Sequence, residues 1–413
     1  MRPDGGRFQA GCDKLPVIAH SKCRKEPTVK KNITTEAKEG RPTKKIRREV
    51  RKLALQEKLT IGVDIGDRTS HYCVRDGKGE IVEEGKLGTT RTGLNALFEG
   101  MATVRVAIEA GTHSPWISRH LSSQGHEVVV ANPRKVKMIS EGSRKNDRVD
   151  AALLAKLAQY DPELLSPIRH RTEETQVHLT HIRSRENLVK TRTALVNEAR
   201  GQVKALGYRL ESCDADNLGL EQAKDLPEGI REALQLTLEA IEQLTEKIKQ
   251  AEWNITQIAK QYPEIKLLTA IYGVGELTAL AFVLTIEDAE RFDKSRDVGA
   301  YLGIAPGQKQ SGDRDPQQRI TKEGDRMVRW LLVQCAHCIL KKTAPDSDLK
   351  RWGEKKLTEH VGKPGKKSSR KKVLVAVARK LSVVMHKLWV NGEIYDPLYN
   401  AKQQARSQEQ PAA

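Results

Sequence analysis

Residues 59–88 read LTIGVDIGDRTSHYCVRDGKGEIVEEGKLG, and the architecture of the first half of the chain follows from them. Apolar and alternating residues form three runs, which are separated by polar residues at 66–68 and by a turn at 76–79. Alternation with a period of two is typical of strands, and Gly and Asp at the breaks favour tight turns. The stretch therefore predicts three short strands in a meander.

Helix and strand patterns alternate after the meander. They predict a helix at 92–101, a strand at 104–110, a helix at 114–125, a strand at 127–133 and a helix that runs through 156. This βββαβαβα order predicts a mixed sheet with helices on its faces. It is the element order of ribonuclease-H-like folds, so an α/β domain of that type is the predicted fold class for the first part of the chain.

The second half of the chain is predicted to be mainly helical. Residues 172–262 predict two long charged helices, and apolar residues recur in the second one at intervals of three or four from Ile230 to Ile248. That spacing is typical of a coiled-coil seam, and it predicts an antiparallel helical hairpin that dimerises. A helix, a Gly-Val-Gly turn and a second helix follow, and a basic linker at 363–372 precedes a last amphipathic helix at 373–389.

These patterns divide the chain into five segments. They are a disordered basic arm (1–55), a ribonuclease-H-like domain (56–165), coiled-coil helices (166–262), a mainly helical C-terminal domain (263–398) and a disordered tail (399–413). Within the arm, the stretch KKIRREVRKLALQEKL has helical spacing and could become ordered on a partner.

The charge of the chain points to a polyanionic partner. Lys and Arg outnumber Asp and Glu by 72 to 54, for a net charge of +18, and residues 1–55 alone hold 16 basic and 6 acidic residues. A positive field favours phosphate backbones, so nucleic acid is the predicted partner and the arm is predicted to add affinity for it. No apolar run is long enough for a membrane span or a signal peptide, which predicts a cytoplasmic protein that does not bind membranes. The six cysteines are irregularly spaced and are predicted to be reduced thiols.

Four carboxylates occupy suggestive places in this order of elements. Asp64 lies in the first predicted strand, Glu109 ends the central strand, and Asp147 and Asp150 stand three apart at the start of a helix. Each alone has an ordinary explanation, since acids at a helix N-terminus commonly serve as caps and dipole partners. Four carboxylates brought together would repel one another unless cations lie among them.

A metal site resolves that repulsion. Two Mg²⁺ ions would bind the four carboxylates and polarise a phosphodiester, while Arg144, Lys145 and Arg148 would contact the nucleic-acid backbone. Sugar kinases and actin-like ATPases also begin with an Asp-x-Gly strand, but they need a second Asp-Gly-Gly phosphate loop, which this sequence lacks. The metal site is therefore the preferred interpretation.

A polar loop in the C-terminal domain carries a candidate nucleophile. Ser311 lies in a loop with four cationic residues, namely Lys309, Arg314, Arg319 and Lys322. A serine oxygen near cations can attack phosphorus and form a phosphoserine link. The residues alone favour the ordinary alternative, a solvated Ser-Gly turn.

Two other motifs have competing interpretations. The turn at Gly273 and Gly275 resembles a helix-hairpin-helix element, whose amides would face a phosphate, but a simple turn between helices explains it equally well. Cys335 and Cys338 have the spacing of half a zinc site, yet no second pair follows and both fall on an apolar helix. Buried thiols are the preferred interpretation of the two cysteines.

Taken in order, several blocks of this sequence resemble the DEDD-type insertion-sequence transposases of the insertion sequence one-ten family. The resemblance covers most of residues 58–398 and rests on IGVDIG, AIEAGT, ANPRKVKMISEGSRKNDRVDA, IYGVGELTA, YLGIAPGQKQSG, RITKEGDRMVRWLL and VLVAVARKLSVVMHKLW. It implies a RuvC-like domain, a coiled coil and a second transposase domain that bears a serine nucleophile. The basic arm 1–55 exceeds the family pattern.

The resemblance also implies roles for particular residues and partners. Matched by position, Asp64, Glu109, Asp147 and Asp150 would bind Mg²⁺ and Ser311 would be the nucleophile. It further implies that a noncoding bridge RNA guides the choice of donor and target double-stranded DNA. Dimers would pair into a tetramer, and each active site would take its acids from one subunit and its serine from another.

Three functions compete at this stage. The first is a transposase or recombinase that cleaves and rejoins DNA through a 5′-phosphoserine intermediate. The second is a metal-dependent nuclease of the Holliday-junction type, which would use water and leave Ser311 without a role. The third is a nucleic-acid-binding scaffold with no catalytic activity.

Overall fold

The computed structural model describes residues 44–134, 146–312, 314, 316, 318–359 and 366–403. The chain forms two compact units that divide between His170 and Arg171. Most of the predicted arm and the end of the predicted tail lie outside the described residues. Within the described ranges, no helix combines the length and the hydrophobicity that a membrane span requires.

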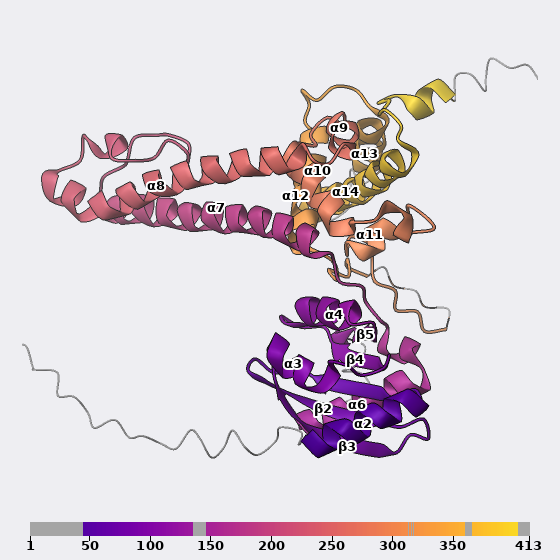
Figure 1. Ribbon diagram of the computed structural model, residues 1–413. Coiled ribbons are helices and arrows are strands. Elements are labelled where there is room, and N and C mark those ends of the chain that lie inside the picture. The colour runs from indigo at the N-terminus through magenta and orange to yellow at the C-terminus, as the bar shows by residue number, and fades with distance from the viewer. Residues whose placement is uncertain are drawn as a thin grey trace, which may run out of the picture. The chain divides into compact units, whose positions relative to one another are not determined.

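The first unit contains a five-stranded mixed sheet. Its strands are β1 (Thr60–Asp64), β2 (Thr69–Arg75), β3 (Ile81–Gly88), β4 (Arg105–Glu109) and β5 (Glu127–Ala131). The strand order is β3-β2-β1-β4-β5, in which β1, β2 and β3 are antiparallel and β4 and β5 run parallel to β1 (Figure 1). The predicted meander and the predicted mixed sheet are both confirmed.

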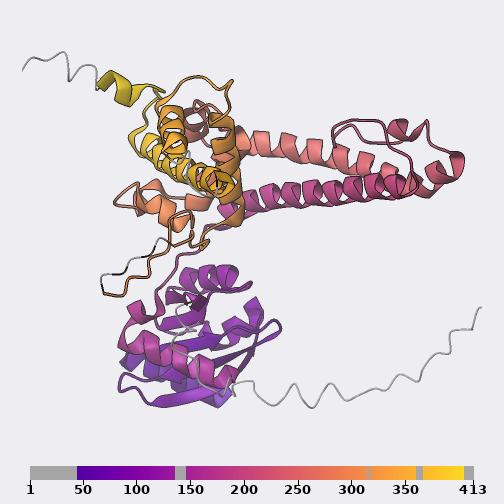
Figure 2. The same cartoon turned by 180° about the vertical axis from the view of Figure 1, so that it is seen from behind.

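Helices cover both faces of this sheet. They are α2 (Lys44–Gln56), α3 (Arg91–Phe98), α4 (Ser114–Ser123) and α6 (Asp147–Tyr160). One apolar core joins α2, α3 and α4 to the strand residues Ile61, Val63 and Ile108. A second core joins Ala107 and Val129 to Leu154 of α6, so α6 covers the opposite face (Figures 1 and 2).

Helix α6 crosses β1 at a glycine. A Cβ atom on Gly62 would lie 2.0 Å from the carbonyl oxygen of Ala151 and 2.5 Å from the amide nitrogen of Ala155. Only a residue without a side chain therefore allows the backbone of α6 to approach β1 so closely. This contact fixes the N-terminal turn of α6 near the end of β1.

We expect Gly62→Ala to loosen this packing. The added methyl group meets backbone atoms, which cannot rotate away, and overpacking of this kind costs about 1–3 kcal/mol of unfolding free energy. Hydrogen–deuterium exchange at the amides of β1 and α6 should accelerate accordingly. Gly111→Ala is the matched control, because no atom lies within 4 Å of its added Cβ, and unaltered exchange in Gly62→Ala would contradict the prediction.

Two long helices begin the second unit. α7 (Glu173–Ala205) and α8 (Glu228–Ala259) pack along each other in opposite directions, as pairs such as Arg185 with Glu252 and Arg192 with Thr245 show (Figure 1). The predicted seam of α8 is buried at Leu234, Leu238, Ile241 and Ile248. The connecting segment folds back on both helices, and its Leu218, Ala223 and Leu226 share their core.

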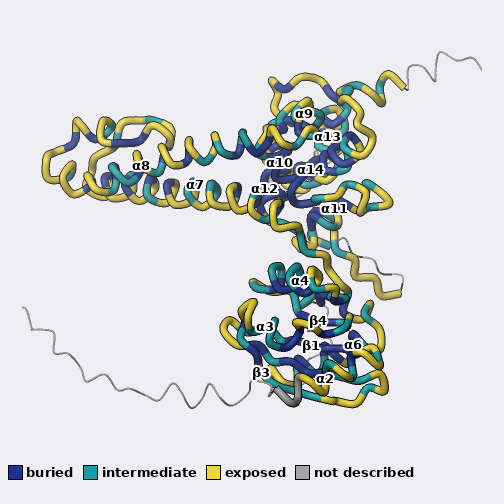
Figure 3. The backbone as a smooth tube through the Cα atoms, viewed as in Figure 1, coloured by how far each residue is buried: buried dark blue, intermediate teal, exposed yellow. Residues whose placement is uncertain are grey.

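The remaining helices form a separate core at the other end of α7 and α8. They are α9 (Glu264–Thr269), α10 (Glu276–Ile286), α11 (Asp297–Tyr301), α12 (Arg326–Ile339), α13 (Asp348–Thr358) and α14 (Lys366–Asn391). Every residue of α10 from Thr278 to Ile286 is buried, which makes this helix the centre of the bundle (Figure 3). Leu179 and Ile182 of α7 and Ile255 of α8 belong to the same core.

Two basic segments are more helical than their composition indicates. Residues 44–55, which the sequence assigns to the arm, belong to α2 (Lys44–Gln56) and are ordered within the chain itself. The predicted basic linker at 363–372 is helical from Lys366 onward, because α14 begins seven residues before the predicted start at Val373. Lys and Arg are good helix formers, so a basic run next to an amphipathic helix extends it readily.

Candidate active site

Asp64 and Glu109 end two neighbouring parallel strands. β1 and β4 pair with Gly62 beside Ala107 and Val63 beside Ile108, so one further step places Asp64 beside Glu109. Neighbouring strands lie about 4.8 Å apart, and paired residues of parallel strands point to the same face. Both acids are half-buried. They therefore share the carboxyl edge of the sheet, where ligands of α/β proteins usually bind.

The face to which these acids point is the one that α6 covers. Gly62 and Ala107, each two residues before an acid, contact or share a core with α6. Side chains of a strand alternate between faces, so Asp64 and Glu109 point to the same side as Gly62 and Ala107. The acids lie beyond Ala151 of α6, toward its N-terminal turn.

That turn of α6 carries the other two predicted acids. Asp147 and Asp150 both lie in it, with Asp150 half-buried and Asp147 exposed. His71 of β2 stands opposite Asp64 in the β1–β2 pairing, and its Nδ1 lies 3.5 Å from Oδ2 of Asp147. This contact places Asp147 near the end of β1, so the first turn of α6 lies at the sheet edge where Asp64 and Glu109 end their strands.

The capping function at this helix belongs to another residue. Asn146 is the N-cap of α6, and its side-chain oxygen accepts a hydrogen bond of 3.1 Å from the amide of Arg148. Asp147 and Asp150 still gain from the positive end of the helix dipole. Since the cap is already provided, capping does not explain why two acids stand here.

The four carboxylates suit a hard divalent cation by their chemistry, since Mg²⁺ prefers oxygen ligands and usually keeps several waters. Among the described residues, no three His, Cys, Asp or Glu side chains are close enough together to form a ligand shell. The acids share one edge without converging on a point. A bound cation would have to draw their carboxylates together.

The predicted cationic flank of this site is only partly described. Arg148 is paired with Glu84 of β3, and its Nε donates a hydrogen bond of 2.6 Å to that carboxylate. The guanidinium would therefore have to leave Glu84 in order to contact a phosphate. Arg144 and Lys145 lie outside the described residues.

Sequence analysis did not identify His71 and Glu84 as part of this site. Both could have been found from the predicted meander, because alternation places His71 and Asp64 on the same face of paired strands.

Cys73 of β2 is buried near Glu84, and burial together with the charge of Glu84 raises the pKa of the Cys73 thiol to about 11. Cys73 is therefore a protonated core residue at neutral pH and no candidate nucleophile.

Ser311 lies in the second unit, at the tip of a narrow loop. Its amide donates to the carbonyl of Arg314 at 3.1 Å, and the amide of Arg314 donates back at 3.2 Å. Gly312 between them has φ +56°, a conformation that glycine adopts without strain. The base of the loop is closed by a bond of 2.9 Å from the Gly307 amide to the Arg319 carbonyl.

This loop presents its serine and its cations to solvent. Ser311 is exposed, and so are the four predicted cations Lys309, Arg314, Arg319 and Lys322. An exposed hydroxyl at a turn is accessible to a large substrate such as a nucleic-acid strand. The acids belong to the first unit and Ser311 to the second, so the candidate residues form two groups.

The Gly-Val-Gly turn has a structural explanation. Gly273 has φ +87°, and a Cβ there would lie 2.9 Å from the Cβ of Cys338 on α12. Gly275 is the N-cap of α10, where Glu276 places a carboxylate in the first turn. Close packing accounts for Gly273, and phosphate binding by the amides after Gly275 stays a prediction.

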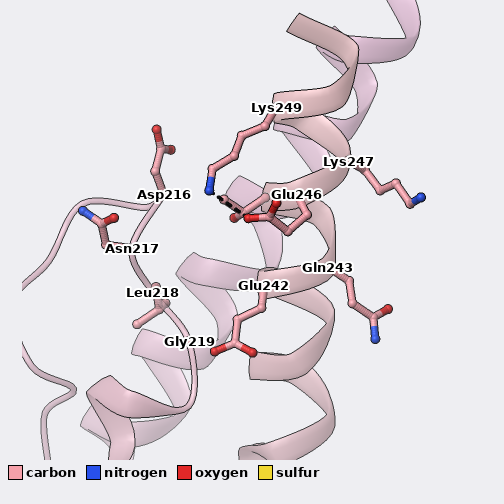
Figure 4. Close-up of a pocket in the computed structure, with 10 residues that line it drawn as sticks. Asp216, Asn217, Leu218, Gly219, Glu242, Gln243, Glu246, Lys247 and Lys249 are labelled. Carbon is pink, nitrogen blue, oxygen red and sulfur yellow. Dashed lines mark hydrogen bonds and ion pairs between the residues drawn. The ribbon is translucent and has the colours of Figure 1, made fainter. Parts of the chain in front are cut away.

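Cys335 and a cavity beside α8 are two further features of the second unit, and neither is a candidate catalytic site. Cys335 is a buried free thiol near Thr278, and burial raises its pKa to about 11. A cavity of about 570 Å³ lies between α8 and the segment that folds back on it (Figure 4). Two of its acids are paired, since Glu246 pairs with Lys249 at 2.8 Å and Asp216 pairs with Arg192.

Two family models match this chain. Residues 61–207 match a transposase domain of the DEDD type, and residues 265–350 match a domain described as transposase IS116/IS110/IS902 family. The first segment contains all four acids, and the second contains Ser311. A domain of the DEDD type implies dependence on a divalent metal ion.

Several curated proteins resemble the chain over most of their length. The transposase for insertion sequence element IS1111A of Coxiella burnetii is 27% identical over 355 residues, which is 84% of this chain and 93% of that protein. The transposase for element IS1328 of Yersinia enterocolitica is 26% identical over 73% of this chain and 90% of its own. The pilin gene-inverting protein of Moraxella bovis is 25% identical over 69% of this chain and 80% of its own.

Proposed function

The chain belongs to the IS110 family of insertion-sequence transposases, and from this premise we propose that it cleaves and rejoins DNA strands through a covalent link to Ser311. Family membership makes it an enzyme that acts on DNA, which excludes the scaffold without activity. The two groups of candidate residues supply the two parts of such a reaction, a nucleophile and a set of carboxylates. We propose that they act together on one phosphodiester.

In the first step, the Oγ of Ser311 attacks the phosphorus of a DNA strand. A bond forms between Oγ and phosphorus, the bond from phosphorus to the 3′ oxygen breaks, and that oxygen leaves as a hydroxyl after taking a proton. The 5′ phosphate stays on the serine. In the second step, the 3′ hydroxyl of another strand attacks the same phosphorus and releases Ser311, so the DNA is rejoined without net hydrolysis.

The single observation that supports this proposal is the place of the candidate acids, at the ends of β1 and β4 and in the first turn of α6. Asp64 and Glu109 stand side by side in paired strands, and Asp147 is linked to the same place through His71. A divalent cation would offset the mutual repulsion of these carboxylates when it draws them together. We therefore assign Asp64, Glu109, Asp147 and Asp150 as the residues that hold Mg²⁺.

A bound Mg²⁺ would supply a Lewis acid that polarises the phosphodiester and stabilises its developing charge. The residues of the chain do the rest. Lys309, Arg314, Arg319 and Lys322 lie exposed in the same loop as Ser311 and would hold the strand by its phosphates. The exposure of the serine loop supports a substrate that arrives from solvent.

We also propose a shared active site, homo-oligomeric assembly as a dimer or tetramer, and a noncoding guide RNA. The separation of the acids and the serine into two compact units supports sharing, because a partner subunit could supply either group. The net charge of +18 supports a second polyanion besides the DNA. The domain boundaries at residues 165 and 262 are likewise our proposal.

The serine mechanism predicts a covalent protein–DNA adduct. When the full chain acts in Mg²⁺ on DNA labelled at the 3′ end of the cleaved strand, the label should migrate with the protein on a denaturing gel. Peptide mapping should place the attached nucleotide on Ser311. Cleavage that releases a free 5′ phosphate without any adduct would instead indicate a nuclease that uses water.

A further inference from the structure

Helix α2 is a part of this chain that neither family match includes. The matched segments begin at residue 61 and at residue 265, whereas α2 spans Lys44–Gln56. It is nevertheless a packed element of the first unit. Val50 is 1% exposed and Ala54 is 7% exposed, and both belong to the core on the face of the sheet away from α6.

The rest of α2 is strongly basic. Its sequence KKIRREVRKLALQ holds six Lys or Arg and a single Glu. Arg48 and Lys52 are exposed and stand four residues apart, so they are neighbours on one side of the helix. The apolar Val50 and Ala54 hold the helix to the sheet, and Arg48 and Lys52 lie on its exposed side.

These outer cations are not compensated by the protein. Within the described ranges, no ion pair or side-chain hydrogen bond is formed by Arg48, Arg51 or Lys52, and the Nε of the half-buried Arg51 has no hydrogen-bond partner. Lys58, two residues after the helix, shows the contrast, because it pairs with Glu127 at 2.7 Å. Among the described side chains of this segment, Lys58 is therefore compensated, whereas Arg48 and Lys52 are exposed and open to a partner.

We propose that the outer surface of α2, centred on Arg48 and Lys52, binds the phosphate backbone of duplex DNA. A rise of about 1.5 Å per residue places these two positions about 6 Å apart along the helix. That distance is close to two steps of about 3.4 Å along one strand of a duplex. Two cations fixed at this spacing can each meet a phosphate.

Two observations favour duplex DNA over single-stranded RNA as the partner. α2 contains no aromatic residue, whereas recognition of single-stranded RNA relies on bases stacked on aromatic side chains. The helix is also packed against the sheet through Val50 and Ala54, and a docked helix suits contacts with a regular backbone. The enzyme already acts on DNA, so an added basic helix on its catalytic domain would lengthen the contact with that substrate.

The inference does not depend on the serine or metal chemistry of the proposed function. Binding through α2 would persist in a chain that cannot cleave, such as Asp64→Asn. Loss of catalysis and loss of this surface are therefore separable results. Only the identity of the polyanion rests on the family.

The test is the salt dependence of DNA binding by full-length variants. The probe is a short fluorescein-labelled duplex of arbitrary sequence, and Kd is measured by anisotropy over a range of KCl concentrations. Arg48→Gln/Lys52→Gln should weaken binding by roughly tenfold or more at about 0.1 M salt, and should lower the slope of log K against log salt by about 1.8. Hydrogen exchange at the amides of α2 checks that the helix stays docked.

Two further variants test whether DNA binding depends on the cations of α2 in particular or on the total positive charge of the unit. Arg48→Lys/Lys52→Arg keeps both charges and should retain the slope. Lys78→Gln/Lys156→Gln removes two exposed cations elsewhere on the same unit and should change the slope less. An unchanged slope in the α2 variant would overturn the inference, as would an equal loss in both double glutamine variants, or a loss confined to a single-stranded RNA probe.

Discussion

Asp64→Asn in the full chain should bind duplex DNA as tightly as the unaltered chain and yet fail to cleave or rejoin it. The change removes one negative charge from the carboxyl edge of the sheet and preserves the size of the side chain. Asp64 ends β1, so the buried residues before it keep their packing. Loss of one group that stabilises transition-state charge commonly costs about a hundred- to a thousandfold in rate, and a metal ligand should cost at least as much.

Strand transfer between a donor and a target DNA in Mg²⁺ is the measurement, with DNA affinity as its companion. Asp67→Asn is the matched control, since Asp67 lies three residues further on, has a side chain 89% exposed and pairs only weakly with His113 at 3.4 Å. This control should keep nearly full activity. Recombination at the unaltered rate in Asp64→Asn would remove Asp64 from the active site and leave the metal site without its central ligand.

The sheet was predictable because its signals are local. Alternation in residues 59–88 and apolar runs at 104–110 and 127–133 reflect burial on one or both faces, which any sheet imposes on its strands. The predicted strands at 104–110 and 127–133 are longer than the observed strands β4 and β5. β4 ends at Glu109 and β5 ends at Ala131, in each case before the predicted end. A strand ends where its neighbour stops pairing, and that neighbour is distant in the sequence.

Helix α2 shows where local signals fail. Its composition resembles a disordered tail, since low hydrophobicity and high charge usually prevent a segment from burying enough surface to fold. Val50 and Ala54 suffice because the sheet offers them a preformed apolar face. The sequence contains the helical spacing, but the surface that orders the helix exists only after β1, β2 and β3 have paired.

The candidate acids were predictable as a set, although their arrangement was not. Asp64 and Glu109 end β1 and β4, which are joined through β2, β3 and α3 and run parallel, so a common edge follows from topology alone. Which face they share depends on Gly62 and on the crossing of α6, a contact between residues about 90 positions apart. The pairing of Arg148 with Glu84 also joins residues that are distant in the sequence. Local sequence patterns do not reveal this pair, so Arg148 was predicted to contact a phosphate directly.

Ser311 could not be singled out by physical reasoning from the sequence. Ser-Gly is a common turn, and the structure shows a turn there, with reciprocal bonds between Ser311 and Arg314. Neither a base nor an acid of the described loop residues forms a hydrogen bond with its hydroxyl. Its assignment therefore rests on the family resemblance.

The second large effect concerns that serine. Ser311→Ala should abolish both the protein–DNA adduct and strand rejoining, because no other group can take the place of the attacking oxygen. Loss of a serine nucleophile costs about a millionfold in a serine protease, so the product should fall below detection. Duplex binding should remain, since the hydroxyl carries no charge and lies in an exposed turn that alanine tolerates.

Ser184→Ala removes another exposed serine of the same unit, on α7, and serves as the matched control with full activity expected. Two results in Ser311→Ala would contradict the serine mechanism in different ways. Continued rejoining would mean that another residue is the nucleophile. Continued metal-dependent cleavage without rejoining would mean that water attacks the phosphodiester, and the enzyme would then share the chemistry of a junction-resolving nuclease. Only the joint loss of adduct and rejoining, with binding intact, fits a serine that carries the DNA strand between two partners.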